Sequence, residues 1–301
     1  MRNFKSTVIS AVLVAITIAS TQSLAMCQAD GTHLQILGSG GPGNSAGRAS
    51  SAYLLWIDGA APLMIDAGSG IKDQFHAAGG GLNQIELLAL SHLHPDHSSG
   101  LPGLLWPAGG NFTIAGPGAR GVFPDIEQFM NLLMGTNGAF AVLQDRLDFS
   151  LLTLDADSIA AQNVFSRGNM RVTARGVPHG DIPTLAYKVD IGESSIVFTS
   201  DQNGSDASFI EFIRDADFLV IHLAAGENVN GRLAELHAKP SVWGQMASAA
   251  GVGHVVVSHI STSSASALND ALVILRDNYS GPVTVGEDLL CVDLSGDRPR
   301  F

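Results

Sequence analysis

Short runs of apolar and β-branched residues recur along the chain, and most are bounded by Gly, Pro or Asp. Runs of this kind predict buried β-strands. We expect strands at residues 33–37, 52–58, 63–65, 86–90, 112–115, 171–177, 184–191, 195–199, 218–222, 254–258, 283–285 and 289–294. Helical patterns predict helices at residues 123–134, 206–214, 241–250 and 264–278. The first third is strand-rich and the last third alternates strand and helix, which indicates an α/β layered fold without an obvious linker.

The first 25 residues follow a different pattern. Arg2 and Lys5 precede a 12-residue apolar run at 8–19, broken only by Ser10 and Thr17, and small residues ending in Ala25 follow. This order is typical of a secretory signal peptide, and the apolar run is shorter than the about 20 residues that span a bilayer. We therefore expect cleavage near Ala25, a periplasmic or secreted protein without stable membrane insertion, and a single domain over residues 26–301.

Composition narrows the class of protein. Hydrophobic residues make up 46% of the 301 residues and charged residues 15%, which excludes intrinsic disorder. The formal net charge is −12, and no basic patch stands out in the sequence. Cys27 and Cys291 are the two cysteines. An oxidising compartment would allow them to pair, but the sequence alone leaves this open.

The strongest chemical signal follows the apolar run at residues 86–90. His92, His94, Asp96 and His97 lie within six positions there. Histidine and carboxylate are the usual ligands of Zn²⁺ and similar metals. One tetrahedral ion cannot accommodate so many neighbouring ligands, so we expect two adjacent ions.

This segment resembles a known family. The string SHLHPDHSSGLPGLL at residues 91–105 is similar to the ribonuclease Z branch of the metallo-β-lactamase superfamily, as are LGSGGP at 37–42 and IDAG at 65–68. The branch also includes type III arylsulfatases and class II cyclic-nucleotide phosphodiesterases. The resemblance runs from about residue 33 to about residue 294. It implies a four-layer αβ/βα fold, with two mixed β-sheets packed face to face and helices outside.

The resemblance also implies the remaining metal ligands, which are His179, Asp201 and His259. Each also follows an apolar run, where α/β sheets place their ligands. By this resemblance, His92, His94 and His179 hold one ion, and Asp96, His97 and His259 hold the other. Asp201 bridges the two ions. Zinc is the first expectation for both ions, although the same ligands accept manganese or iron.

Asp96 and His237 are the candidate catalytic residues. The resemblance implies that His237 stabilises the phosphate or protonates the leaving group. Asp66 is a candidate for orienting a ligand histidine, although a turn role is nearly as well supported. His222 is followed by Leu223 where the ribonuclease Z pattern has an acid, and we consider Glu227 or Glu235 as substitutes for that acid. We expect structural roles for three further histidines, namely His33, His76 and His254.

These features predict an exported hydrolase with two metal ions, which cleaves small phosphodiesters or sulfate esters by hydroxide attack. A hydrolase of another bond, such as a lactone, and a metal-binding protein without turnover remain alternatives. The acidic balance, the export signal and the short interval between His179 and Asp201 lead us to expect a small ester substrate and no nucleic acid. A homodimer is expected from the resemblance. Residues 116–148 form either a lid or an ordinary core segment.

Overall fold

The computed structural model of the protein describes residues 27–43, 45–107, 110–146 and 148–294. The expected signal peptide and its cleavage point at Ala25 lie outside these residues. Within the described part of the chain, none of the helices combines the length and apolar character needed to cross a bilayer.

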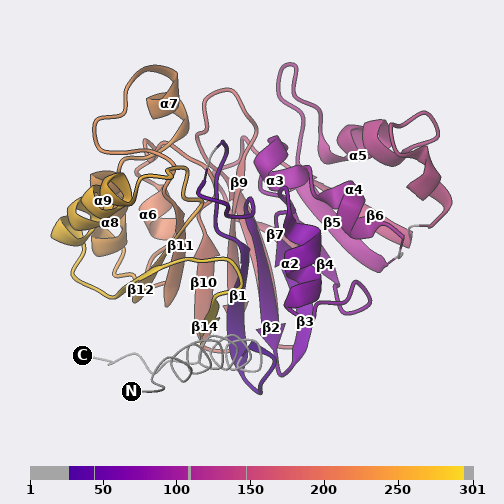
Figure 1. Ribbon diagram of the computed structural model, residues 1–301, viewed down its shortest axis with the longest axis horizontal. Coiled ribbons are helices and arrows are strands. Elements are labelled where there is room, and N and C mark those ends of the chain that lie inside the picture. Colours follow the sequence, from indigo (N-terminus) through magenta and orange to yellow (C-terminus); the bar gives the residue numbers. More distant parts are fainter. Residues whose placement is uncertain (1–26, 44, 108–109, 147, 295–301) are drawn as a thin grey trace, which may run out of the picture.

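Two seven-stranded sheets form the centre of the molecule (Figure 1). The N-terminal sheet has the order β14, β1, β2, β3, β4, β5, β6. Its strands are β1 (Thr32–Gly38), β2 (Ala52–Ile57), β3 (Ala60–Ile65), β4 (Leu87–Ala89), β5 (Asn111–Pro117), β6 (Asp148–Leu154) and β14 (Cys291–Asp293). The C-terminal sheet has the order β13, β12, β11, β10, β9, β8, β7. Its strands are β7 (Gln162–Arg167), β8 (Met170–Gly176), β9 (Leu185–Ile191), β10 (Ser194–Phe198), β11 (Phe218–His222), β12 (His254–Ser258) and β13 (Val283–Val285).

Each sheet changes from antiparallel to parallel pairing part-way across. Strands β1 to β3 are antiparallel and β3 to β6 are parallel. Strands β7 to β10 are antiparallel and β10 to β13 are parallel. The carboxyl ends of the parallel strands therefore lie together at one edge of each sheet, which is where sheets of this kind bind ligands.

Helices cover the outer faces of both sheets. The helices are α2 (Ile71–Ala77), α3 (Pro95–Ser98), α4 (Leu101–Leu105), α5 (Ile126–Met134), α6 (Phe209–Phe212), α7 (Gly231–Leu236), α8 (Pro240–Ala249) and α9 (Ala265–Asn278), with a 3₁₀ turn at Ala141–Arg146. Along β2, Tyr53 and Leu55 face the other sheet, whereas Leu54 and Trp56 face the outer helices. A third apolar cluster lies between the C-terminal sheet and α6, α8 and α9. The expected four-layer fold is confirmed.

The sequence missed β6, β7 and the short helices α2, α3, α4 and α7. Strands β6 and β7 are edge strands, paired on one side, and their side chains are largely exposed or half-buried. Strand β7 therefore lacks a continuous apolar run, whereas β6 has apolar residues at positions 149, 151 and 152 that the sequence analysis did not recognise as a strand. The short helices contain four to seven residues, which is too few to establish a helical period.

Two questions that the sequence left open have structural answers. Helix α5 buries Ile126, Met130 and Met134 in the cluster outside the N-terminal sheet, so this part of residues 116–148 is a core helix. Cys27 and Cys291 form a disulfide bond, with their Cα atoms 5.6 Å apart. The disulfide joins the start of the described chain to β14.

Candidate metal centre

The predicted site residues meet at the carboxyl ends of the strands. Asp66 follows β3, Asp201 follows β10 and His259 follows β12. The backbone is left-handed at Asp66, Ser200 and His259, with φ of 58°, 57° and 52°. Non-glycine residues adopt this conformation at a cost, and such strain is concentrated at functional sites. The chain thus turns sharply where each of these strands ends, which aims the following side chain into the site.

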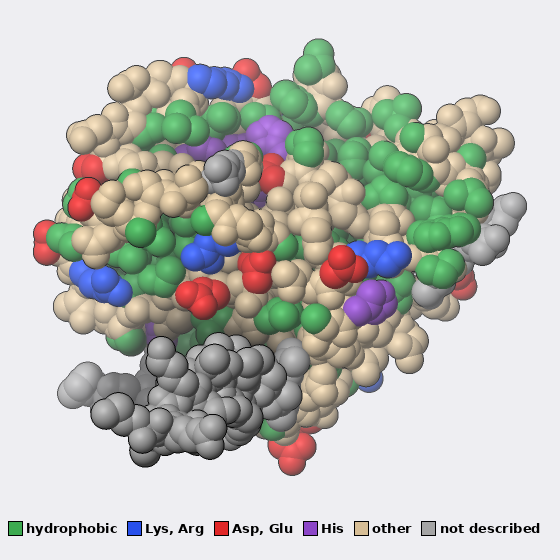
Figure 2. Space-filling view, in the orientation of Figure 1, with side chains coloured by type: hydrophobic (Ala, Val, Ile, Leu, Met, Phe, Trp, Pro, Cys, Tyr) green, Lys and Arg blue, Asp and Glu red, His purple; other side chains and the backbone are tan. Residues whose placement is uncertain are grey.

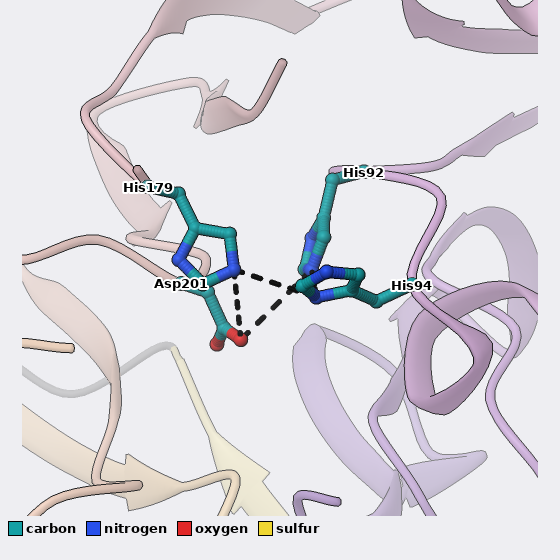
Figure 3. Close-up of side chains that lie close together, drawn as sticks. All are labelled: His92, His94, His179 and Asp201. Carbon is teal, nitrogen blue, oxygen red and sulfur yellow. Dashed lines mark hydrogen bonds and ion pairs between the residues drawn. The ribbon is translucent and has the colours of Figure 1, made fainter. Parts of the chain in front are cut away.

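His92, His94, His179 and Asp201 form the first group of possible metal ligands (Figure 3). One ligand atom from each lies within 4.8 Å of all the others. His94 Nδ1 is 3.0 Å from His92 Nε2 and 3.4 Å from His179 Nε2. His179 Nε2 is 3.8 Å from Asp201 Oδ2. The structure therefore brings together the four residues predicted for the first ion.

A second group contains His97, Asp201, His222 and His259, again with ligand atoms within 4.8 Å of one another. His97 Nε2 faces His259 Nε2 at 3.0 Å. Asp96 Oδ2 lies beside this pair, 3.1 Å from His259 Nε2 and 3.5 Å from His97 Nε2. Asp201 belongs to both groups, and Asp96, His97 and His259 come together as predicted.

Two of the candidate ligand histidines are oriented through Nδ1. His97 Nδ1 lies 2.7 Å from Asp66 Oδ2, and the Asp66 carboxylate also accepts bonds from the Ser91 backbone N–H and hydroxyl. His179 Nδ1 lies 2.8 Å from the carbonyl oxygen of Leu236. Partners of this kind fix the tautomer and leave Nε2 as the ligand atom. The structure thus gives Asp66 the contact that its predicted orienting role requires.

The donor set fits divalent metal ions. In a tetrahedral zinc site with Zn–N bonds of 2.0–2.1 Å, two ring nitrogens lie about 3.3 Å apart. The separations of 3.4 Å for His94 and His179 and 3.0 Å for His97 and His259 are close to this value. Facing imidazole lone pairs repel each other unless a proton or a cation lies between them. Imidazole and carboxylate ligands suit zinc and related divalent ions.

The charges of the buried groups are strongly coupled. Burial would raise the pKa of Asp201, but the nearby His259 and His97 rings outweigh it and hold the pKa well below its usual range. Burial would lower the pKa of His97, yet Asp66 and Asp201 outweigh it and raise that pKa well above the usual value. Burial lowers the pKa of His179 and His222 to about 4. These shifts keep the Asp201 carboxylate ionised and the His179 ring neutral, as metal binding requires, whereas His97 is protonated in the metal-free protein.

His237 lies beside the centre but outside both ligand groups. Its Nδ1 is 3.8 Å from Asp201 Oδ2 and has no hydrogen-bond partner among the described residues. Burial lowers the pKa of His237. Glu227 accepts bonds from Ser241, and Glu235 accepts one from Arg232, so these two acids are engaged elsewhere.

His222 is the site residue that the sequence analysis did not assign to the metal centre. Its Nδ1 lies 2.8 Å from Asp201 Oδ1, and its ring stacks on that of His259. The signal was present, since His222 ends an apolar strand as the other site residues do. Leu223 packs into the outer apolar cluster. The leucine that stands where the ribonuclease Z pattern has an acid therefore adds no side chain to the site.

The three remaining histidines have contacts outside the centre. His254 Nε2 bonds the Thr284 hydroxyl, and the His76 ring packs against Phe75. His33 is buried near Asp293. These contacts agree with the structural roles expected for them.

Histidine side chains (purple in Figure 2) are visible in a hollow near the top of the molecule in this view.

The sequence of this chain matches a known protein family. The sequence model described as "Beta-lactamase superfamily domain" matches residues 62–260. The chain belongs to the β-lactamase superfamily. Ribonuclease BN from Erwinia tasmaniensis is 30% identical to this superfamily member over 165 residues. That match covers 52% of the chain and 49% of the relative, so the chain spans about half the length of this curated relative. The resemblance to the ribonuclease Z branch is confirmed.

Solved structures show the same fold for this superfamily member. The metallo-β-lactamase fold protein YhfI from Bacillus subtilis has a TM-score of 0.69 and 22% identity, and the match covers 87% of this chain and 99% of that chain. Human tRNase Z, short form, has a TM-score of 0.67 and 20% identity, covering 88% and 100%. At these identities the likeness shows the fold alone.

The expectation of a substrate without nucleic acid is wrong. The matched curated relatives are ribonucleases, and one structural neighbour is a tRNase. The prediction relied on the net charge, which adds the charges of all side chains in the sequence. Bound cations are the largest local charges in a site of this kind, and the net charge does not include them.

Proposed function

We propose that this superfamily member is a metal-dependent phosphodiesterase that binds two divalent ions, zinc first among them, and that RNA is its natural class of substrate. The observation that carries the proposal is the shared position of Asp201. Its Oδ2 lies 3.9 Å from His92 Nε2, and its Oδ1 lies 3.4 Å from His259 Nε2. One carboxylate within reach of two ligand groups suits a pair of adjacent ions.

In this proposal the first ion is held by His92, His94 and His179, the second by Asp96, His97 and His259, and Asp201 lies between them. When bound, such a pair supplies an activated water near neutral pH and a clamp for the attacking and leaving oxygens. Phosphoryl transfer then depends mainly on positioning and charge stabilisation by the surrounding residues.

Asp96 and His237 have complementary roles in the proposed reaction. The Asp96 side chain is 12% exposed, compared with 2% for Asp201, so Asp96 is the carboxylate more open to substrate. His259 and His97 outweigh the effect of burial and lower the pKa of Asp96, which keeps this carboxylate ionised as a hydrogen-bond acceptor for the attacking water. His237 Nδ1 faces Asp201, which leaves Nε2 of the protonated ring to donate a proton to the leaving oxygen.

RNA is favoured as the substrate by the curated relatives, which are ribonucleases. Every link of an RNA backbone is a phosphodiester, the bond that this arrangement suits. A sulfate ester has similar geometry, so the two bond types need direct comparison.

We also propose that the protein is exported. The disulfide between Cys27 and Cys291 supports this, because disulfides persist in oxidising compartments such as the periplasm. The signal-like pattern before Ala25 agrees with it. Sequencing the N-terminus of the protein recovered outside the cytoplasm tests the proposal, and an intact residue 1 on protein found only in the cytoplasm would contradict it.

The decisive experiment compares substrates with and without chelator. The full chain would be loaded with Zn²⁺ or Mn²⁺ and assayed on bis-p-nitrophenyl phosphate, p-nitrophenyl sulfate and an RNA with a single-stranded 3′ extension. We expect cleavage of the diester and the RNA that is lost with chelator and restored by metal. Sulfate cleavage without diester cleavage would replace this function with a sulfatase activity.

Two histidine variants test the proposed role of His237. His237→Ala should lower turnover about 100-fold or more, the scale of a lost general acid, while leaving metal content unchanged. His254→Ala alters a histidine at the opposite end of β12 from the site and should leave turnover unchanged. Equal turnover of the two variants would remove His237 from the mechanism.

A further inference from the structure

A chain of hydrogen bonds leads from the N-terminal sheet to Asp201. Ser51 Oγ donates to the Tyr53 oxygen at 3.2 Å, at the start of β2. The Tyr53 oxygen lies 3.1 Å from Nε2 of His222, which ends β11 in the other sheet. Nδ1 of His222 lies 2.8 Å from Asp201 Oδ1. This relay therefore crosses the interface between the two sheets.

The chemistry of each group sets the direction of the bonds. The Tyr53 oxygen accepts the Ser51 hydrogen, so its own O–H is free to donate to His222 Nε2. A neutral imidazole that accepts at Nε2 carries its hydrogen on Nδ1, which then donates to Asp201. Without the tyrosine hydroxyl, the ring could place its hydrogen on Nε2 and turn a lone pair toward the carboxylate.

The members of the relay are held in place by packing. Tyr53, His222 and Asp201 are each at most 2% exposed. The His222 ring stacks on His259 with centroids 4.6 Å apart and an interplanar angle of 4°. The Trp243 indole N–H donates to the backbone carbonyl of His222.

We infer that Tyr53 and His222 are positioning residues, which hold Asp201 by Oδ1 and thereby aim Oδ2 between the two metal-ligand groups. Oδ2 lies 3.9 Å from His92 Nε2, 3.6 Å from His97 Nε2 and 3.8 Å from His179 Nε2. The inference rests on the metal assignment in the proposed function. It excludes His222 as a ligand, because both of its ring nitrogens are occupied by the relay.

Two tyrosine variants test the relay. Tyr53→Phe removes the hydroxyl and keeps the ring. Tyr279→Phe is the matched control, because Tyr279 is also buried and its hydroxyl donates to the Val252 carbonyl, in the layer outside the C-terminal sheet. Metal-free proteins would be titrated with Zn²⁺ against a chromophoric chelator, and with Co²⁺ to record the visible spectrum. We expect Tyr53→Phe to weaken zinc binding about 10–100-fold and to change the Co²⁺ spectrum, with neither effect in Tyr279→Phe.

A second pair of variants separates positioning from ligation. His222→Asn retains an N–H donor near the position of Nδ1, so it should keep more zinc affinity than His222→Ala. Equal loss in these two variants would make His222 a ligand and overturn the inference. Unchanged zinc affinity and Co²⁺ spectrum in Tyr53→Phe would overturn it too, leaving that tyrosine with packing alone. Zinc binding by the wild type without phosphodiester cleavage would refute the proposed function, while the affinity ratio would still decide the relay.

Discussion

The two halves of the candidate metal centre are built differently. The N-terminal sheet contributes four closely spaced residues from one segment after β4, namely His92, His94, Asp96 and His97, the last two in helix α3. The C-terminal sheet contributes single residues from the ends of β8, β10, β11 and β12, namely His179, Asp201, His222 and His259. One half depends on local chain geometry and the other on the pairing of strands far apart in sequence.

The strand register explains how the dispersed half is assembled. In the parallel pairing, Phe198 of β10 is opposite Val220 of β11, and His222 of β11 is opposite Ser258 of β12. Strand ends that are aligned in this way present their following residues at one edge. A shift of register in β10 to β12 would therefore separate the dispersed candidate ligands, whereas the residues of the segment after β4 would keep their spacing.

The largest expected effect comes from Asp201→Asn, because Asp201 is the member of the dispersed half that lies in both ligand groups. The change removes the charge and keeps the shape. We expect turnover on a phosphodiester to fall on the order of 10³-fold, the upper scale for loss of one charge-stabilising group, with zinc affinity reduced as well. Steady-state kinetics and chelator competition measure the two effects.

Asp288→Asn provides the matched carboxylate control. Asp288 accepts bonds from Ser39 and Ala49 and joins two loops outside the ligand groups. It should keep turnover per folded molecule while losing some stability. Similar turnover in the two variants would show that the shared position of Asp201 has no catalytic consequence.

The same contrast explains what could be predicted from the sequence. The segment after β4 was recognisable because its four candidate ligands lie within six positions, and the apolar runs located most strands of both sheets. His179, Asp201 and His259 required the family resemblance in addition, since one polar residue after a strand is common. His222 had the same local signal but no matching ligand motif. Its role depends on contacts with Tyr53 and Asp201 that only the packed sheets create.

A smaller effect is expected from Asp66→Asn, which alters how a histidine is oriented in the contiguous half. Asp66 accepts a bond from His97 Nδ1, whereas His179 in the dispersed half donates to a backbone carbonyl. An asparagine can still accept from the Ser91 N–H, but its amide leaves His97 without an anionic partner. We expect zinc affinity to fall about 10–100-fold, as for other partners of ligand histidines.

Metal content at limiting zinc shows whether the Asp66→Asn variant loses one bound ion or both. Because Asp66 contacts only His97 among the ligand histidines, loss of one of two bound ions is the expected result. Loss of both ions in parallel would mean that the two ligand groups are not independent, and the contrast between the halves would not extend to metal binding.

The last expected effect concerns stability in acid. Burial lowers the pKa of His92 and His94 in the contiguous half, as it does for two histidines of the dispersed half, whereas the pKa of His97 is raised. Burial lowers the pKa of His179 and His222 to about 4, from a usual value of 6.5. Between these pH values the unfolded chain binds protons that the folded chain does not. The free energy of unfolding of the metal-free protein should therefore fall as the pH falls from 6.5 to 4. The free energy of unfolding should fall by at most on the order of 3 kcal/mol for each such histidine.

His97 should add no slope in this window. Burial would lower its pKa, but Asp66 and Asp201 outweigh burial and raise the pKa well above 6.5, so His97 is protonated in both states. Urea unfolding of chelator-treated protein at several pH values measures the slope, and His222→Asn should reduce it by up to one proton per molecule. An unchanged slope in that variant, with a reduced slope in His97→Gln, would reverse the comparison. His97 would then be the neutral buried histidine, and His222 the protonated one.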